Sequence, residues 1–109
     1  MYNGIVGLKP TMGLVSRYGN VPTTNTLDVI GPMTRSVADA ALVLAAMAGR
    51  DENDPSTWAQ GDGVPVDYAR ALNPDGLRGA RIGIHRPRWD ALEGAKARAF
   101  GGLRAALED

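Results

Sequence analysis

Lys9 and Ser16 are the side chains whose types come nearest to a catalytic pair, because a lysine can act as the base that activates a serine nucleophile. Lys9 stands before Pro10 where a short apolar run ends, and Ser16 opens a segment rich in turn-forming residues. Nearness in the sequence does not bring the two groups within hydrogen-bond reach. We therefore expect a solvated lysine and a loop serine that caps a turn.

His85 is the only histidine of the chain and the second candidate for chemistry. It follows a short apolar segment that reads as a strand, and active-site groups often gather at strand ends. The sequence shows no carboxylate or cysteine that would pair with it. A structural or solvent-exposed histidine is the expected outcome.

The third candidate is the acidic segment that contains Asp51, Asn53 and Asp54, which superficially resembles a calcium-binding loop. Pro55 stands where the third ligand would be needed, and the glycine and the distal glutamate of such loops are absent. The sequence also contains no phosphate-binding glycine loop, dinucleotide fingerprint, zinc-ligand spacing or G-x-S-x-G elbow. We therefore predict a polar turn here, no metal site and no cofactor.

The elements that would position these residues begin with two short strands. Residues 4–8 form an apolar run stopped by proline, which lacks a backbone donor, and this pattern predicts a buried strand. Residues 12–15 are a second strand candidate. Residues 16–31 hold several Gly, Pro, Asn and Thr residues and predict a long irregular loop, a kind of loop that is usually functional or part of a larger fold.

A helix after this loop is the clearest element. Ser36 can cap its first turn, and Asp39 lies where a carboxylate favours the positive end of the helix dipole. Residues 40–48 are all apolar, and Gly49 is a natural left-handed terminator. A helix that is apolar on nearly every side is expected to be covered on more than one side.

The second half of the chain carries weaker signals. Residues 50–64 predict polar turns, residues 67–72 one or two helical turns, and residues 81–85 a short strand. Residues 91–109 predict an amphipathic helix, interrupted by Gly101-Gly102 at a cost of about 1 kcal/mol per glycine. Its apolar residues recur at helical spacing: Leu92, Ala95, Ala99, Leu103 and Ala106.

These elements predict an α/β fold with few strands and two main helices. Three short strands and one apolar helix would leave much surface uncovered, so the pattern is typical of a slice of a larger α/β/α sandwich. We expect a single partial domain over residues 1–109, without an internal boundary.

Composition limits the classes of function. The 12 basic and 12 acidic residues cancel, which does not favour binding to nucleic acid or to an anionic membrane. With 44% hydrophobic and 22% charged residues the chain is globular, and the absence of cysteine excludes disulfide and thiol chemistry. No signal peptide or membrane span is visible, so the expected location is the cytoplasm, although a signal in a missing N-terminal part would not be seen.

An ordered series of motifs resembles the amidase signature family, the Ser-cis-Ser-Lys amide hydrolases. The series covers nearly the whole chain and is most specific over residues 4–54. Its motifs are Gly7-Leu8-Lys9-Pro10-Thr11, Ser16-Arg17-Tyr18-Gly19, Pro22, Asp28, Gly31-Pro32-Met33, Arg35, Asp39-Ala40-Ala41 and Gly49. The later segments Asp67-Tyr68 and Leu77-Arg78-Gly79-Ala80-Arg81-Ile82-Gly83 are most similar to the peptide-amidase-like branch.

The resemblance implies an α/β/α sandwich around a mixed sheet and hydrolysis of amides through an acyl-serine. It places the family's lysine, both of its serines and its glycine-rich oxyanion loop upstream of the matched motifs, with Met1 just after that loop. Lys9 and Ser16 therefore match structural positions, and we expect no catalytic, cofactor-binding or metal-binding residue in this chain. The matched residues are expected to end strands, turn the chain and cap the helix, and the loop between Tyr18 and Asp28 to wall the family's pocket.

Three functions follow as hypotheses, and whether the chain is an enzyme stays open among them. The first is an amidase fragment that is inactive alone and contributes to hydrolysis only in a full-length protein. The second is a non-catalytic interaction module, or one half of a split enzyme, that associates through uncovered apolar faces. The third is a fragment of the kind found in transfer-RNA amidotransferases, in the amidase-like chain of those enzymes, whose branch shares the Ser16-Arg17-Tyr18-Gly19 motif.

Overall fold

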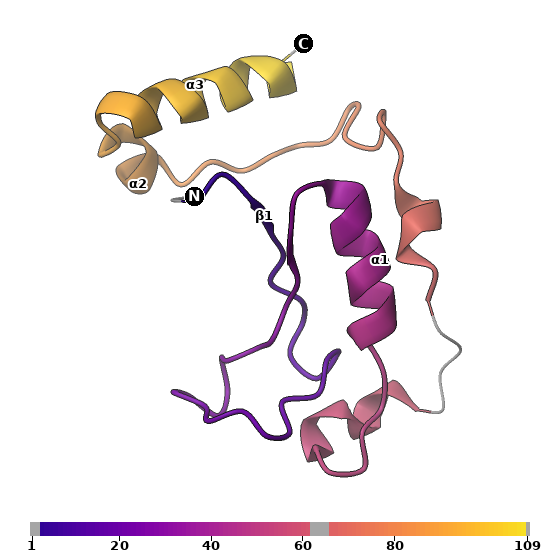
Figure 1. Cartoon of the computed structure of the whole chain (residues 1–109). Helices are drawn as coiled ribbons and strands as arrows, with labels where there is room; N and C mark the ends of the chain where they lie inside the picture. Colours follow the sequence, from indigo (N-terminus) through magenta and orange to yellow (C-terminus); the bar gives the residue numbers. More distant parts are fainter. Residues whose placement is uncertain (1–2, 62–65, 109) are drawn as a thin grey trace. The chain divides into compact units, whose positions relative to one another are not determined.

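The structure, a computed structural model, describes residues 3–61 and 66–108 and divides into two compact units after Leu72. Unit 1 contains two short strands, one α-helix and two 3₁₀-helices, and unit 2 contains two α-helices (Figure 1). The described residues thus combine helices with one short ladder, in agreement with the predicted α/β class.

The ladder of unit 1 joins β1 (Val6–Gly7) to β2 (Met33–Thr34) in antiparallel pairing, with Val6 opposite Thr34. The amide of Leu8 extends it by donating to the carbonyl of Pro32 at 3.1 Å. The predicted strand over residues 4–8 is therefore real but short. It is not buried: Ile5 and Leu8 are 44% and 39% exposed, because the ladder has only two strands.

Residues 12–15 do not form the predicted strand. They form a turn in which the amide of Leu14 donates a hydrogen bond to the carbonyl of Thr11. Only Val15 pairs with another segment, in an isolated bridge with Ala48. Gly13, with φ +83°, allows this turn to run against the Ser56 carbonyl, where a Cβ atom would overlap the oxygen.

Helix α1 (Val37–Met47) begins as the sequence predicts, since the Ser36 hydroxyl accepts a hydrogen bond from the Asp39 amide at 3.1 Å. It ends where the sequence predicts, just before Gly49, but the cap is more extended than a left-handed turn. Ala48 is extended (φ −72°, ψ 139°), and Gly49 follows with a positive φ of 154°, which side chains other than glycine rarely adopt. The bridge to Val15 and a hydrogen bond from the Gly49 amide to the Leu14 carbonyl draw the chain away from the helix axis.

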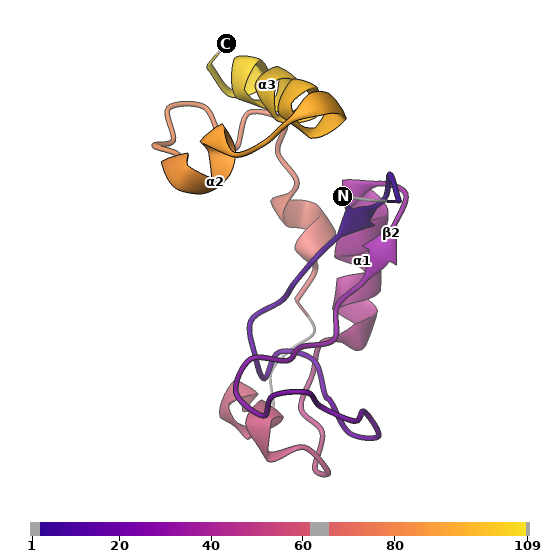
Figure 2. The same ribbon diagram turned by 90° about the vertical axis from the view of Figure 1, so that its left-hand side faces the viewer.

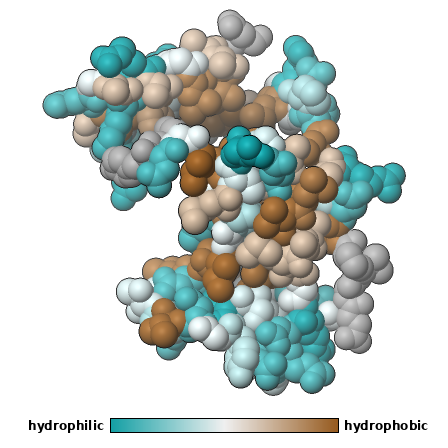
Figure 3. All heavy atoms as spheres, in the orientation of Figure 1, coloured by the Kyte–Doolittle hydropathy of each residue, from teal (hydrophilic) through white to brown (hydrophobic). Residues whose placement is uncertain are grey.

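The core of unit 1 is small and lies along one side of α1. Its buried apolar residues are Val15, Ala40, Ala41 and Leu44. In Figures 1 and 2, β1 and β2 lie beside α1, and the 3₁₀-helix η2 (Tyr68–Ala71) also packs on it. The other side is open: Leu42 is 59% exposed, and apolar atoms reach the surface over this helix (Figure 3). The ladder and η2 thus cover α1 on two sides, as the sequence predicts, and the side that carries Leu42 stays open.

The polar segment after α1 is more regular than the turns predicted for residues 50–64. It forms the 3₁₀-helix η1 (Pro55–Gln60), which Asp54 caps by accepting from the Ser56 amide at 3.0 Å. Residues 62–65 lie outside the described residues. The prediction of a helical turn within residues 67–72 is confirmed by η2, which Asp67 caps through the amide of Ala69.

Unit 2 has no strand among its described residues. Residues 81–85, predicted as a strand, run extended without a ladder partner and lead into α2 (Arg86–Asp90), a helix that the sequence did not reveal. Helix α3 (Gly94–Glu108) confirms a helix in the tail, and it continues through Gly101-Gly102 without a break. It begins at Gly94 and not at Ala91, and of the predicted apolar face within this helix only Leu103 lines the pocket beside it, together with Phe100 and Leu107. Trp89 and Phe100 join α2 to α3 through an edge-to-face contact with ring centroids 5.3 Å apart.

Candidate functional site

The predicted Lys9–Ser16 pair does not form. The Ser16 hydroxyl donates to the Asp51 carboxylate at 2.6 Å and accepts from the amide of Tyr18 at 3.1 Å. Lys9 is exposed and shares no hydrogen bond or ion pair with Ser16 or any other described residue. Ser16 thus caps a turn, as expected from the sequence, and its hydroxyl is bonded to a carboxylate and not to Lys9.

Asp51 is the first of three carboxylates that order the long loop and the acidic turn of unit 1. Besides the serine hydroxyl, its side chain accepts from the amide of Asn53 at 2.9 Å. Its own amide donates at 2.9 Å to the hydroxyl of Thr57, a residue with 0% exposure. The Thr57 hydroxyl lies 2.9 Å from the Asp54 carbonyl and 3.1 Å from that of Asp51, so its proton can be donated to either. The acidic segment is therefore a closed turn around one buried hydroxyl.

Asp54 links this turn to Arg17. Its carboxylate accepts from the Arg17 amide at 2.7 Å and lies 3.8 Å from the guanidinium Nε. Nη1 of the same guanidinium bonds to the long loop: it donates to the carbonyl of Asn25 at 2.8 Å and lies 3.4 Å from the carbonyl of Asp28. Arg17 therefore ties the acidic turn to the far end of the long loop.

Asp28 closes the same loop from inside. Its carboxylate accepts from the amides of Thr23 and Thr24 at 2.5 and 2.9 Å and from the Thr24 hydroxyl at 3.0 Å. The loop predicted as irregular over residues 16–31 lacks regular structure, but side-chain hydrogen bonds hold it along its length.

These hydrogen bonds lower the pKa of all three carboxyl groups below the ordinary value of 3.8. The amide of Thr24 is the largest cause at Asp28, followed by that of Thr23. The Ser16 hydroxyl is the largest cause at Asp51, and the Arg17 amide at Asp54. Each donor favours the ionised form, so all three side chains are carboxylates at neutral pH and act only as acceptors.

A pocket of about 240 Å³ opens between the loop and the acidic turn; we call it the loop pocket. It is lined by Arg17, Tyr18, Gly19, Asn20, Pro22, Asn25, Asn53 and Asp54. Tyr18 is 70% exposed beside it. Its lining is polar but carries no nucleophile with a base, so it can bind a ligand rather than transform one.

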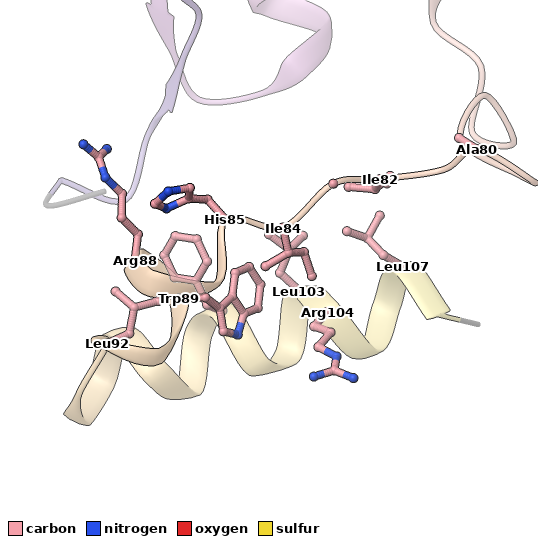
Figure 4. A pocket seen from close by; sticks show the side chains of 12 residues that line it. Ala80, Ile82, Ile84, His85, Arg88, Trp89, Leu92, Leu103, Arg104 and Leu107 are labelled. Carbon is pink, nitrogen blue, oxygen red and sulfur yellow. The ribbon is translucent and has the colours of Figure 1, made fainter.

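Unit 2 carries a larger and more apolar pocket of about 620 Å³, which we call the apolar groove. It runs between the extended residues 82–84 and α3 (Figure 4). Ile82, Ile84 and Leu103 line it and are 40–49% exposed. His85 lies at its edge, just before α2, and makes no capping hydrogen bond. His85 is exposed, which agrees with the prediction of a structural or solvent-exposed histidine.

The described residues hold no group of three His, Cys, Asp or Glu side chains that could bind a metal ion. Asp51 and Asp54 accept hydrogen bonds from protein donors, so the acidic segment forms the polar turn that the sequence predicts. Their anchoring role was not predicted. The signal was present in the alternation of Asp and Asn with Pro, Ser and Thr over residues 51–57, which is typical of side-chain-capped turns.

Nowhere in the described ranges 3–61 and 66–108 is a helix both long and apolar enough to cross a bilayer.

The family model described as "Amidase" matches residues 1–109. Among curated proteins, the A subunit of the glutamyl-tRNA(Gln) amidotransferase from Thermosynechococcus vestitus is 46% identical over 106 residues, 96% of this chain and 20% of that protein. Its counterpart of the same name from Gloeobacter violaceus is 55% identical over 81 residues, 74% of this chain and 16% of its own length. The chain thus spans about a fifth of the length of these relatives.

Solved structures of amidases also match this chain. An amidase family protein from Bacillus anthracis matches 97% of this chain with a TM-score of 0.81 and 39% identity, and the match covers 21% of that chain. The native peptide amidase from Stenotrophomonas maltophilia matches 71% of this chain, with a TM-score of 0.65 and 57% identity over 16% of its own length.

Proposed function

The chain belongs to the amidase family, and from that premise we propose that it is a scaffold segment of an enzyme that hydrolyses carboxylic amide bonds through an acyl-serine. In this proposal the nucleophile and its base come from amidase sequence other than the residues present here. The α/β/α sandwich of the enzyme would include α1 and α3 among its helices. The chain alone is inactive.

The observation that carries this proposal is the bonding of Ser16. A nucleophilic serine needs a base that can take its proton, and a carboxylate with a lowered pKa is a poor one. Ser16 donates to such a carboxylate, Asp51, while Lys9 is exposed and bonded to neither. The geometry supports a structural serine and gives no support to a catalytic pair within this chain.

A chimera tests the proposal. The segment of the Stenotrophomonas maltophilia peptide amidase that matches this chain is replaced by the sequence of this chain, at 57% identity. We expect the folded chimera to release ammonia from a peptide amide, and the 109-residue chain alone to release none. Ser16→Ala and Lys9→Ala in the chimera should keep most of the activity, because neither residue does chemistry.

Two results would count against the proposal. Turnover by the purified chain alone, lost on Ser16→Ala, would make Ser16 a nucleophile. A chimera that folds, as judged by circular dichroism and a cooperative melt, but hydrolyses no amide would show that this chain cannot serve as amidase scaffold.

The apolar groove favours a second candidate function, association with another polypeptide. Unit 2 has no fully buried residue among those described, and its isoleucines and leucines are partly exposed around the groove. Exposed apolar surface of this kind marks an interaction site. The partner we propose is a separate amidase-type chain that carries the lysine and the serines, so that the two together are active.

Mixing tests this split-enzyme alternative. The chain is combined with the peptide amidase from which the matching segment has been deleted, and both amide hydrolysis and co-migration in size exclusion are measured. Activity of the mixture and of neither part supports it, and Leu103→Glu, at the rim of the groove, should then abolish co-migration. Parts that neither bind nor hydrolyse would contradict it.

The names of the curated relatives favour a third candidate, a segment of the amidase-like chain of a transfer-RNA amidotransferase. To separate this candidate from the peptide-amidase-type scaffold, the same replacement is made in the Thermosynechococcus vestitus protein. A chimera that keeps a larger fraction of its parent's activity there than in the peptide amidase would favour the amidotransferase branch. The equal numbers of acidic and basic residues give no reason to expect contact between this segment and transfer RNA.

A further inference from the structure

Residues 81–84 form an extended segment of unit 2 whose backbone groups are unpaired. The amides and carbonyls of this segment make no hydrogen bond with any other described residue. The turns on both sides of it are closed, since the Ala80 amide donates to the Leu77 carbonyl and the Arg88 amide to the His85 carbonyl. A strand edge with free donors and acceptors is a template on which another extended chain can pair.

Helix α3 supports one face of this segment. Ile82 and Ile84 line the apolar groove together with Leu103 of α3 (Figure 4). Side chains alternate along an extended chain, so Arg81 belongs to the opposite face, and it does not line the groove. A strand added at the edge of the segment would place every second side chain in the groove, whose volume is about 620 Å³. Those side chains must be apolar to match the lining.

The charge around the segment is positive. Residues 76–89 contain four arginines and the only histidine of the chain, but no aspartate or glutamate. Three of these arginines, Arg81, Arg86 and Arg88, share no ion pair with another described residue. No carboxylate lines the apolar groove. Unpaired cations at both ends of the segment favour a partner that carries carboxylates.

A second copy of this chain matches the segment poorly. Antiparallel pairing of two copies centred on Gly83 would place Arg81 of one copy beside His85 and Arg86 of the other. Parallel pairing in register would place the two Arg81 side chains together. Like charges opposite each other in a ladder are destabilising. The partner therefore has a different sequence, with carboxylates where this chain has cations.

We propose that residues 81–85 are a docking site for an extended acidic peptide, which adds as a strand beside them. Apolar side chains at every second position of the peptide lie on α3 with Ile82 and Ile84, and carboxylates at the other positions face Arg81 and His85. Backbone hydrogen bonds supply affinity, and the alternation supplies selectivity. The site goes beyond the proposed function, because it requires neither an amide substrate nor an amidase-type partner.

Titration of the ¹⁵N-labelled chain with a short peptide tests the proposal. The capped peptide Ac-Glu-Val-Thr-Val-Glu-NH₂ has the same sequence in both directions, so either strand orientation brings glutamates to Arg81 and His85. We expect saturable amide shifts over residues 81–85. Amide exchange should slow at alternate residues of the segment, because one edge of a strand presents the amides of every second residue.

Two further peptides separate charge from alternation. Ac-Lys-Val-Thr-Val-Lys-NH₂ reverses the charge, and Ac-Val-Val-Thr-Glu-Glu-NH₂ keeps the composition but loses the alternation. Each should bind at least about fivefold more weakly than the glutamate peptide, since cross-strand pairs contribute a fraction of the free energy that corresponds to a tenfold change each and several are lost.

Charge reversal in the chain completes the test. Arg81→Glu should weaken binding of the glutamate peptide at least about fivefold and strengthen binding of the lysine peptide. Arg98→Glu is the matched control, because it makes the same charge change at an exposed residue of α3 that does not line the groove. It should leave the affinities for both peptides unchanged at physiological salt.

Several results would overturn the docking site: no saturable shift, equal binding of the lysine peptide, shifts confined to residues 3–61, or uniform exchange along the segment. Slowed exchange that appears without peptide and grows with chain concentration would assign the segment to a second copy instead. If Arg81→Glu fails to fold, the three peptides still decide on the unmodified chain. Failure here is distinct from failure of the proposed function, since an active chimera with no peptide binding removes only the docking site, and an inactive chimera with peptide binding removes only the function.

Discussion

Thr57 is the residue whose replacement tests most sharply whether the acidic turn holds the long loop of unit 1. Thr57→Val removes the one hydroxyl at the centre of the turn with little change in side-chain shape. The Asp51 amide then loses the acceptor that it has at 2.9 Å, in a site where the threonine is 0% exposed. An unpaired buried amide costs about 1–3 kcal/mol.

The assay is amide hydrogen exchange at Arg17, whose amide donates to the Asp54 carboxylate on the other side of the turn. A loss of about 2 kcal/mol corresponds to about a 30-fold fall in its protection, at 1.4 kcal/mol per tenfold. Thr57→Ser is the matched control, because it keeps the hydroxyl and removes one methyl. That change costs about 1 kcal/mol and should reduce protection about fivefold.

The reasoning would be refuted if Thr57→Val lowered the protection of Arg17 no more than Thr57→Ser does. The turn would then be held by packing around its methyl group, and the hydrogen bonds to the hydroxyl would carry none of its stability.

Gly13→Ala should lower the melting temperature more than Gly4→Ala. Both changes place an alanine at positive φ, at a cost of about 1–2 kcal/mol each, but only the alanine at position 13 would also overlap the Ser56 carbonyl. Equal melting temperatures of the two variants would contradict that close approach. The protection of the Thr23 amide should stay constant from neutral pH down to about the ordinary aspartate pKa of 3.8 and fall only below it, as Asp28 protonates. A carboxyl group whose pKa is lowered in the folded state stabilises the fold above its unfolded-state pKa, and this stabilisation is lost as the pH falls through the folded-state pKa. Asp28→Asn should remove this pH dependence, and a fall in protection that begins near pH 6 would be inconsistent with it. Gly101→Ala should stabilise α3 by about 1 kcal/mol, seen as increased helical circular dichroism, because no atom lies within 4 Å of the added methyl; a decrease would show a contact there.

Local signals predicted some elements well because their cause is local. The Ser36 cap and the apolar run after it predicted the start of α1, and apolar spacing predicted α3. Gly101-Gly102 did not break α3, since two glycines cost about 2 kcal/mol and the flanking helical residues offset it. The extended conformation of Ala48 after α1 accompanies a bridge to Val15, a residue distant in sequence, and was therefore missed.

The strands predicted over residues 12–15 and 81–85 failed for a related reason. A strand needs a partner, and residues 81–85 have none in the described part of the chain, although their apolar pattern is that of a strand. The candidate site was likewise only half predictable. Residue types predicted a polar turn and a capping serine, but the hydrogen bonds from Ser16 to Asp51 and from Arg17 to Asp54 join residues far apart in sequence and were not predictable from local patterns.

Amide hydrolysis by the peptide amidase chimera is the most direct test of the central claim, that this chain supplies amidase scaffold and not amidase chemistry. The account predicts an active chimera, retained activity after Ser16→Ala and Lys9→Ala, and no turnover by the 109-residue chain alone. Amide hydrolysis by the purified chain that disappears on Ser16→Ala would contradict it.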